Sequence, residues 1–292
     1  MNTSTIEIIN AFVDGDRGGN PAGVVLQADN LDRAAKQAIA RRVGFSETAF
    51  VSKSAVADYK LDFFTPTRQI AHCGHATIAT FAYLAQQGLL SEGESSKETI
   101  DGRRRIVIED DMAFMEQRTP VYNSLELELK KDMLHALGLK PADLLTDLDM
   151  EVVDTGNRFL IVAVKNQEIL KSIIPDQSTI GNMSERFELI GIYVFTPQSI
   201  KPGRDATTRM FAPFYGIPEE SATGMAAGPL ACYLRDRAGV DKTDFLIEQG
   251  YFMTPPSGSL ITVKLAIAEG RIQSLLAGGR ARHIKRIKQS FD

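Results

Sequence analysis

The hydrophobic pattern of the first half of the chain predicts several strands and one exposed helix. Leu31, Ala35, Ile39 and Val43 recur with the spacing of one helical face, and the Gly44 that follows is typical of a helix end. Around this helix, short apolar runs bounded by turn-forming residues indicate strands at 6–12, 22–26, 48–51, 59–64, 106–108 and 112–115.

The second half of the chain combines the same two periods. Helical stretches are predicted at 131–137, 168–173 and 176–189. Apolar runs predict strands at 151–153, 159–164, 192–195, 207–211, 245–248, 260–268 and 271–276. Because strands and helices alternate without the regular βαβ spacing of a doubly wound fold, we expect an α+β fold with mixed sheets.

Two further helices, at 74–84 and 224–238, consist largely of small residues and have no strongly polar face. A helix that is apolar all round is buried, so we expect a mixed β-sheet wrapped around each of them. Pro229 lies in the second helix and is tolerable only near its first turns, because proline lacks the N–H group that a helix interior uses.

These two helices belong to an internal repeat. Four residues of the first helix recur 150 positions later in the second: Gly74, Ala76, Tyr83 and Leu84 recur as Gly224, Ala226, Tyr233 and Leu234. The repeat predicts two similar domains that face each other, at 1–119 and 120–292, with a last strand that can return to the first domain. Since a helix N-terminus carries unpaired N–H groups and a partial positive charge, two such ends would form a clamp for a carboxylate.

Composition and charge narrow the class of protein. The 292 residues are 43% hydrophobic and 24% charged, as in an ordinary globular protein of about two domains. The net charge of −4 gives no positive surface for nucleic acid. Residues 1–5 do not resemble a signal peptide, no apolar run is long enough to span a bilayer, and two cysteines are too few for a disulfide framework. We therefore expect a cytoplasmic protein without a nucleic-acid or membrane partner; a homodimer is compatible with the sequence.

Two residues are candidates for acid–base chemistry in the first half. Glu47 lies between a helix end and an apolar strand, where partly apolar surroundings would raise the pKa of its carboxyl group towards neutrality. A surface carboxylate at a strand start is the alternative. His75 follows Gly74 at a helix N-terminus, where an imidazole tends to stay neutral and could relay a proton. A packed, hydrogen-bonded histidine is the alternative for this residue.

Other chemistry has less support. Cys73 precedes a helix, where the pKa of a thiol is lowered, yet no local signature of a catalytic cysteine surrounds it. Cys232 is expected in the core. His72, Cys73 and His75 are clustered without a second ligand pair, and nucleotide-binding motifs are missing, so neither a metal nor a cofactor is expected.

Two carboxylates precede the second small-residue helix. Glu219 and Glu220 could complement the dipole of that helix, or either could be the second carboxylate of an acid–base pair.

At these positions the chain resembles the PhzF family of phenazine-biosynthesis-type isomerases, which share the diaminopimelate epimerase fold. The matching segments occur in the family's order at 19–24 (GNPAGV), 46–51 (SETAFV), 64–66 (FTP), 73–77 (CGHAT), 211–213 (FAP) and 222–224 (ATG). The resemblance implies two pseudo-symmetric domains, each a sheet around a central helix, with a site in the cleft between them.

The resemblance also implies a reaction. In the family's best-understood member, a glutamate moves a proton between two carbons of trans-2,3-dihydro-3-hydroxyanthranilate without a cofactor, assisted by a histidine and an aspartate. Glu47 takes the place of the glutamate and His75 that of the histidine. Glu220 takes the place of the aspartate, with a side chain one methylene longer. Gln69 and Met225 stand where an acidic residue and a serine are usual.

We therefore expect a cofactor-independent isomerase or epimerase that moves a proton between carbons of a small carboxylic acid. The residues expected to bind that substrate are Asn20, Cys73, Gly74, Gly224 and Met225. Two alternatives remain: a non-catalytic member of the fold that binds a small molecule or a protein, and a two-thiol amino-acid racemase. The racemase would need a second cysteine near 220–224.

Overall fold

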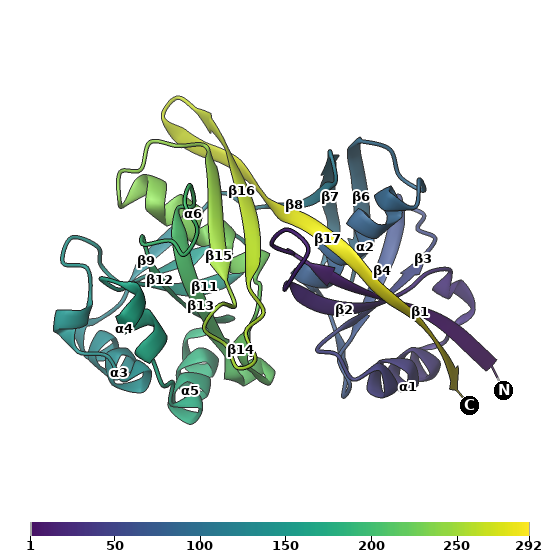
Figure 1. The fold of residues 1–292 in the computed structure, drawn as a ribbon, viewed down its shortest axis with the longest axis horizontal. Coiled ribbons are helices and arrows are strands. Elements are labelled where there is room, and N and C mark those ends of the chain that lie inside the picture. Colours follow the sequence, from purple (N-terminus) through teal and green to yellow (C-terminus); the bar gives the residue numbers. More distant parts are fainter. Residues whose placement is uncertain (1, 292) are drawn as a thin grey trace. The chain divides into compact units, whose positions relative to one another are not determined.

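The computed structural model describes residues 2–291 and divides the chain into two compact units. Unit 1 comprises Met1–Glu116 and Gly278–Asp292, and unit 2 comprises Gln117–Ala277. The sequence suggested a boundary at 119/120, whereas the contacts divide the chain after Glu116 and assign the last residues to unit 1. Figure 1 shows that last strand, in yellow, beside the first strand, in purple.

Unit 1 is a mixed sheet with one buried and one peripheral helix. Its strands are β1 (Asn2–Ala11), β2 (Asn20–Val25), β3 (Thr48–Ser52), β4 (Tyr59–Phe64), β5 (Gln69–Ile70), β6 (Gly93–Thr99), β7 (Gly102–Glu109), β8 (Met112–Gln117) and the end of β17 (Arg271–Phe291). Its helices are η1 (Ala28–Asn30), α1 (Arg33–Val43) and α2 (Gly74–Gln86).

The strand pairing in unit 1 alternates between the two directions. β1 pairs antiparallel with both β17 and β2, and β2 pairs parallel with β3. β3 pairs antiparallel with β4, β4 parallel with β6, and β6, β7 and β8 antiparallel in turn. The prediction of a mixed sheet is therefore confirmed for this unit.

Helix α2 is the centre of unit 1, as its small residues predicted. Every residue of 74–84 is buried, and the helix packs against β1, β2, β3 and β7. Its two threonines satisfy their hydroxyl groups within the helix: Thr77 Oγ1 donates to the carbonyl of Cys73 at 2.6 Å, and Thr80 Oγ1 donates to that of Ala76 at 2.7 Å. The helix can therefore bury polar side chains without leaving donors unpaired.

Strand β6 was missed from the sequence because its buried side chains are polar. Ser95, Ser96, Lys97 and Thr99 are buried in a strand that carries no large apolar residue. Hydrophobic periodicity identifies a strand only when apolar side chains cover the core. In β6, the buried hydroxyl groups of Ser95 and Ser96 instead donate hydrogen bonds to the carboxylate of Asp58.

Unit 2 combines a second mixed sheet with four α-helices. Its strands are β9 (Val121–Ser124), β10 (Glu151–Asp154), β11 (Arg158–Ala163), β12 (Gly191–Thr196), β13 (Ala206–Ala212), β14 (Ile217–Glu220), β15 (Asp244–Gln249), β16 (Ser259–Ala268) and the start of β17. Its helices are α3 (Leu127–Leu137), η2 (Pro141–Asp143), α4 (Gln167–Ser172), α5 (Gln177–Phe187), η3 (Pro213–Tyr215) and α6 (Gly224–Asp236).

The pairing of unit 2 is also mixed. β9, β10 and β11 are antiparallel neighbours, and β11 pairs parallel with β12. β13 pairs antiparallel with β12 and β14 and parallel with β15, which is antiparallel to β16. The predicted boundary at 119/120 lies just before strand β9, which pairs with β10 and therefore belongs to the sheet of unit 2.

Helix α6 is buried as predicted, and Pro229 lies near its start. Gly224 and 226–234 are buried, and Pro229 is the sixth residue of the helix, close to its first turns as the sequence required. The side chain of Gln117 lies against Gly228, where a Cβ atom would overlap the amide group. Gln117 Nε2 donates to the carbonyl of Gly224 at 2.9 Å, so this glycine lets a polar side chain reach the start of the helix.

The remaining helices of unit 2 cover a separate apolar core. Residues of α3, α4 and α5 pack there against strands β10, β11 and β12, with Met133, Leu170, Ile180 and Val194 in the cluster. Across residues 2–291, no helix is both long and apolar enough to cross a membrane.

Candidate active site

Glu47 lies in the connection between α1 and β3. Helix α1 ends at Gly44, whose φ of 73° is left-handed and turns the chain towards the strand. The carbonyl of Glu47 then accepts the N–H group of Gly23 in β2 at 3.1 Å, next to the parallel β2–β3 pairing. Only 5% of Glu47 is exposed. The structure therefore excludes the alternative of a surface carboxylate.

His75 is the second residue of α2 and faces Glu47. Its Nε2 lies 3.3 Å from Glu47 Oε2, and its Nδ1 lies 3.7 Å from Cys73 Sγ. All three side chains are buried. The α1–β3 connection and the first turn of α2 thus bring a carboxylate, an imidazole and a thiol together, as a proton-transfer site requires.

The thiol in this group is not activated. Burial raises the pKa of Cys73, and this effect outweighs the lowering by His75. The expectation of a lowered pKa at the helix N-terminus was wrong, because removal of the thiolate from water dominates. Cys73 is therefore a neutral thiol at neutral pH. The neutral imidazole tautomer that suits both neighbours carries its proton on Nε2, towards the carboxylate.

The same three residues have the spacing of a metal site. One ligand atom from each of Glu47, Cys73 and His75 lies within 4.8 Å of the other two. Zinc accepts all three ligand types, with water as the fourth ligand in catalytic sites. A metal there would be held by the carboxylate of Glu47, the imidazole of His75 and the thiolate of Cys73, which would release its proton on binding.

Asn20 and Gly74 also lie in unit 1. Asn20 is the buried first residue of β2, opposite Ala11 of β1. Gly74 is the first residue of α2, which has neither a capping side chain nor an acidic residue in its first turn. The positive end of the helix dipole is therefore not offset by a carboxylate of its own first turn.

In unit 2, the structure distinguishes Glu219 from Glu220. Both carboxylate oxygens of Glu219 accept from the guanidinium of Arg209, at 2.9 and 2.8 Å. Arg209 Nη1 also donates to the carbonyl of Ile173 at 2.8 Å. Glu219 is therefore committed to a largely buried ion pair that fixes β14, which leaves Glu220 as the candidate carboxylate.

Glu220 is the half-buried last residue of β14 and contacts the turn that leads into α6. Its Oε2 accepts a hydrogen bond from the hydroxyl of Thr223. Gln249, at the end of β15, donates from Nε2 to the carbonyl of Glu220 at 2.8 Å and to Thr223 Oγ1 at 3.0 Å. Sequence reasoning missed Thr223 and Gln249 as members of this group. A glutamine that ends an apolar strand was the only available signal.

Gly224 and Met225 open helix α6. The carbonyl of Gly224 accepts from Gln117, and Met225 Sδ accepts from Asn157 Nδ2 at 3.5 Å. Like α2, helix α6 has no capping side chain and no acidic residue in its first turn. Met225 thus presents a thioether beside an amide, at the position where a serine would offer a hydroxyl group.

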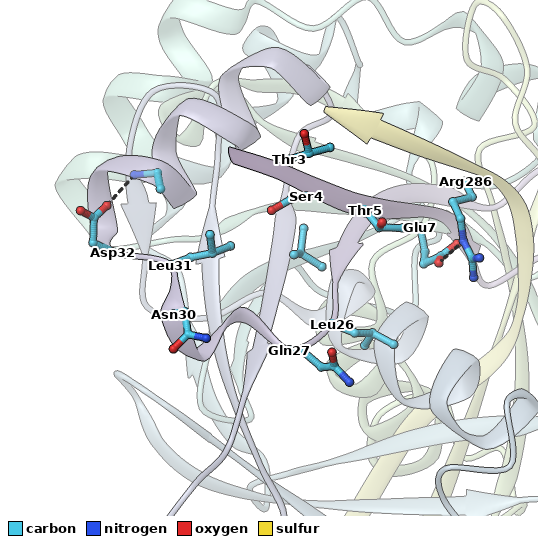
Figure 2. Close-up of a pocket in the computed structure, with 12 residues that line it drawn as sticks. Thr3, Ser4, Thr5, Glu7, Leu26, Gln27, Asn30, Leu31, Asp32 and Arg286 are labelled. Carbon is cyan, nitrogen blue, oxygen red and sulfur yellow. Dashed lines mark hydrogen bonds and ion pairs between the residues drawn. The ribbon is translucent and has the colours of Figure 1, made fainter. Parts of the chain in front are cut away.

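A hollow elsewhere in unit 1 contains none of the predicted site residues. It has a volume of about 740 Å³ and lies between β1, η1 and the start of α1 (Figure 2). Its two carboxylates are already engaged: Glu7 with Arg286 and His283, and Asp32 with the N–H group of Ala35. The hollow therefore lacks the paired acid–base groups found at Glu47.

The chain is similar to proteins of a known family over most of its length. Residues 9–285 match the model of the PhzC-PhzF family, described as phenazine biosynthesis-like protein. The uncharacterized isomerase YddE of Escherichia coli K12 is 36% identical over 77% of both chains. The trans-2,3-dihydro-3-hydroxyanthranilate isomerase of Pseudomonas fluorescens is 31% identical over 92% of this chain and 91% of its own. The protein belongs to the PhzC-PhzF family, and the predicted enzyme class, isomerase, is confirmed.

Solved structures agree with this assignment. A PhzF-family phenazine biosynthesis protein of Bacillus anthracis has a TM-score of 0.91 at 28% identity, with all of both chains covered. A protein of Pseudomonas aeruginosa described as a predicted epimerase has a TM-score of 0.79 at 22% identity and covers 99% of this chain and 100% of its own. The chain therefore has the mixed α+β fold shared by PhzF proteins and epimerases.

Proposed function

We propose that this isomerase moves a proton between two carbons of a small carboxylic acid, with Glu47 as the proton carrier. The observation that carries the proposal is the buried carboxylate of Glu47, 3.3 Å from His75 Nε2 at the start of α2. A carboxylate that is shielded from water and oriented by an imidazole is suited to removing a proton from carbon.

The proposed reaction is balanced without an oxidant, a reductant or a co-substrate. Glu47 takes a proton from one carbon, and the electron pair of the broken C–H bond moves into the adjoining π-system. The carboxylic acid of Glu47 then returns a proton to a second carbon, where a new C–H bond forms. Substrate and product have the same formula. His75 orients the carboxylate through Nε2, and the neutral thiol of Cys73 faces its other nitrogen.

Substrate binding is proposed separately for each unit. In unit 1, the backbone N–H groups at Gly74 would bind an anionic group, aided by Asn20 and Cys73. In unit 2, the start of α6 at Gly224 would do the same. The first turns of α2 and α6 have neither a capping side chain nor an acidic residue, which supports carboxylate binding at either helix.

Glu220 and Met225 are proposed to set the choice of substrate. Glu220 would bind a polar hydrogen of the substrate, while Met225 offers an apolar thioether rather than a hydroxyl group. The Pseudomonas fluorescens relative is named for its action on trans-2,3-dihydro-3-hydroxyanthranilate. We therefore choose that compound as the first test substrate, together with smaller unsaturated and 2-amino carboxylic acids.

The test is proton exchange with solvent. The wild-type protein is incubated with each compound in deuterated water, and the products are followed by proton NMR. We expect isomerisation or deuterium incorporation at carbon with at least one compound. Glu47→Gln is expected to lower that rate by about 10²–10⁴-fold, the usual contribution of general acid–base catalysis. Retention of the wild-type rate in Glu47→Gln would exclude Glu47 as the proton carrier.

A matched control separates the loss of chemistry from the loss of a carboxylate. Glu98 of β6 accepts a hydrogen bond from Ser54 in the same unit. Glu98→Gln makes the same chemical change away from His75 and is expected to keep the wild-type rate. Both variants should melt close to the wild-type temperature.

The two-thiol racemase loses support from the geometry. The residue 150 positions after Cys73 is Thr223, and Cys232 is buried inside α6. Burial also raises the pKa of the Cys232 thiol well above its ordinary value. A racemase of that class needs two thiols that can both exchange protons at neutral pH.

A further inference from the structure

The side chain of Gln249 is a completely buried amide that links three elements of unit 2. Gln249 is the last residue of β15, has no exposed surface, and lies opposite Ser259 in β16 and Thr208 in β13. A buried primary amide must satisfy two donors and an acceptor oxygen. The hydrogen-bond partners of Gln249 therefore indicate the orientation and the role of its amide group.

The orientation of this amide follows from a donor that cannot reverse. The backbone N–H group of Thr223 lies 3.0 Å from Gln249 Oε1 and can only donate. The hydroxyl of Tyr193 donates to the same oxygen at 2.9 Å. A flipped amide would place its NH₂ group against the N–H group of Thr223. The Nε2 atom therefore faces the carbonyl of Glu220 and the hydroxyl of Thr223.

This orientation decides the direction of the next hydrogen bond. Gln249 Nε2 donates to Thr223 Oγ1 at 3.0 Å, so that hydroxyl acts as an acceptor towards the amide. The single hydroxyl proton of Thr223 is then directed to Oε2 of Glu220. Hydrogen bonds therefore run in one direction, from Gln249 through Thr223 to the carboxylate of Glu220.

Gln249 also holds both ends of the turn that presents Glu220. Its Nε2 binds the carbonyl of Glu220 at 2.8 Å, and its Oε1 binds the N–H group of Thr223. The turn from β14 into α6 is thus clamped by one side chain at its first and last residue.

We propose that Gln249 is a positioning residue for Glu220, which it orients through the hydroxyl of Thr223. The inference rests on the proposed function, in which Glu220 contacts the substrate. Gln249 itself touches no reacting atom in this assignment. Its effect should fall on substrate recognition, and therefore on KM more than on kcat.

The first test compares two substitutions of Thr223. Thr223→Val keeps the shape of the side chain and the backbone bond to Gln249 but removes the hydroxyl group. A hydrogen bond to a charged group commonly contributes about 10–100-fold, so we expect kcat/KM to fall by about that factor, mainly through KM. Thr223→Ser restores the hydroxyl and should recover most of the loss.

A control removes a buried threonine hydroxyl elsewhere. The hydroxyl of Thr80 in α2 donates to the carbonyl of Ala76 in the same helix. Thr80→Val is expected to change kcat/KM less than about twofold, since its hydroxyl does not lead to Glu220. An equal loss in Thr80→Val and Thr223→Val would overturn the proposal.

The second test addresses Gln249 directly. Gln249→Glu replaces the donating Nε2 by an oxygen, so Thr223 would donate to residue 249 instead of Glu220. If both residues act through one chain of bonds, adding Thr223→Val to Gln249→Glu should cost little further activity. Full additivity of the two losses would contradict the proposal.

An NMR measurement keeps the inference testable if Gln249→Glu does not fold or no substrate is found. In wild-type protein, the side-chain NH₂ protons of Gln249 should exchange slowly with solvent and resonate downfield of solvent-exposed glutamine side chains. In Thr223→Val, one of them should move upfield, whereas Thr223→Ser should leave it unchanged. An unaltered Gln249 signal in Thr223→Val would refute the positioning chain. Failure of the proposed function would instead appear as the absence of proton exchange in the wild type.

Discussion

Lys97 Nζ lies 2.6 Å from Thr77 Oγ1, and both residues are completely buried in unit 1. The same amine lies 3.3 Å from His72 Nδ1 and 5.1 Å from the ring centre of Phe63. Burial lowers the pKa of Lys97 to about 7, with a further lowering by Arg104 and an opposing effect of Asp101. Burial also lowers the pKa of His72 well below its usual value, so this imidazole is neutral at pH 7.

Lys97 should therefore make the stability of the protein depend on alkaline pH. Below pH 7 the amine is charged in both the folded and the unfolded chain, and the cost of burying the charge is fully present. Between pH 7 and about 10.4 the unfolded chain binds more protons, so stability rises with pH by at most about 1.4 kcal/mol per unit.

Denaturant unfolding of wild type and Lys97→Met at several pH values measures this effect. Between pH 7 and 9, the free energy of unfolding should rise more for the wild type than for Lys97→Met. Parallel pH profiles would contradict a lowered pKa for this amine.

Glu47 and His75 should lose activity as one unit. If His75 acts by orienting the carboxylate of Glu47, its removal matters only while that carboxylate is present. We expect His75→Asn to lower kcat by about 10–100-fold, the range of an interaction with a charged group. The Glu47→Gln/His75→Asn double variant should be about as slow as Glu47→Gln alone. Steady-state kinetics of the three variants measure this effect. If the double variant lost the product of the two single losses in kcat, the two residues would have independent roles.

The buried thiol of Cys73 should be unreactive in the folded protein. Because burial raises its pKa, little thiolate is present at pH 7–8 to attack iodoacetamide. Mass spectrometry after alkylation should show Cys73 unmodified in buffer and modified rapidly in urea. Activity should survive the treatment. Rapid alkylation of the native protein, accompanied by inactivation, would restore a reactive role for this thiol.

Gly228 should not tolerate a methyl group. A Cβ atom there would overlap the amide of Gln117, which bonds to the carbonyl of Gly224 and to the hydroxyl of Thr155. Gly228→Ala should therefore lower the free energy of unfolding by about 1–3 kcal/mol, as overpacking does.

The matched control for Gly228→Ala is Gly181→Ala in α5. There the nearest atom is 3.8 Å from the new Cβ, in ordinary contact. That substitution should stabilise the protein by roughly 0.5–1 kcal/mol, the usual advantage of alanine over glycine inside a helix. A stabilising Gly228→Ala would show that Gln117 can move aside without cost.

The sequence predicted the parts of the fold that apolar side chains define. The buried helices α2 and α6 followed from small residues without a polar face, and strands such as β3 and β4 followed from apolar runs. Strand β6 did not, because serines and Lys97 fill its buried positions. Its placement depends on partners such as Asp58, which only the folded chain brings near.

The candidate site was predictable to a similar extent. Glu47 and His75 became candidates because each lies beside a recognisable element boundary and matches a PhzF-family segment, and the structure places the two side chains next to each other. The raised pKa of Cys73 could not be predicted, because a neighbouring helix end and burial act in opposite directions and only the structure gives their relative size. Gln249 was missed because its role depends on residues more than twenty positions away.

The path of β17 has a consequence for how the chain folds during synthesis. Its first residues belong to unit 2, those from Gly278 onwards belong to unit 1, and 281–291 pair with β1. Because β1 is synthesised long before β17, the edge of β1 that pairs with β17 stays open until β17 has been made. Unit 2, which is continuous in sequence, can complete its contacts earlier. Although unit 1 begins earlier in the sequence, it should be the second unit to finish folding, and removal of the residues of β17 that pair with β1 should expose β1 to aggregation.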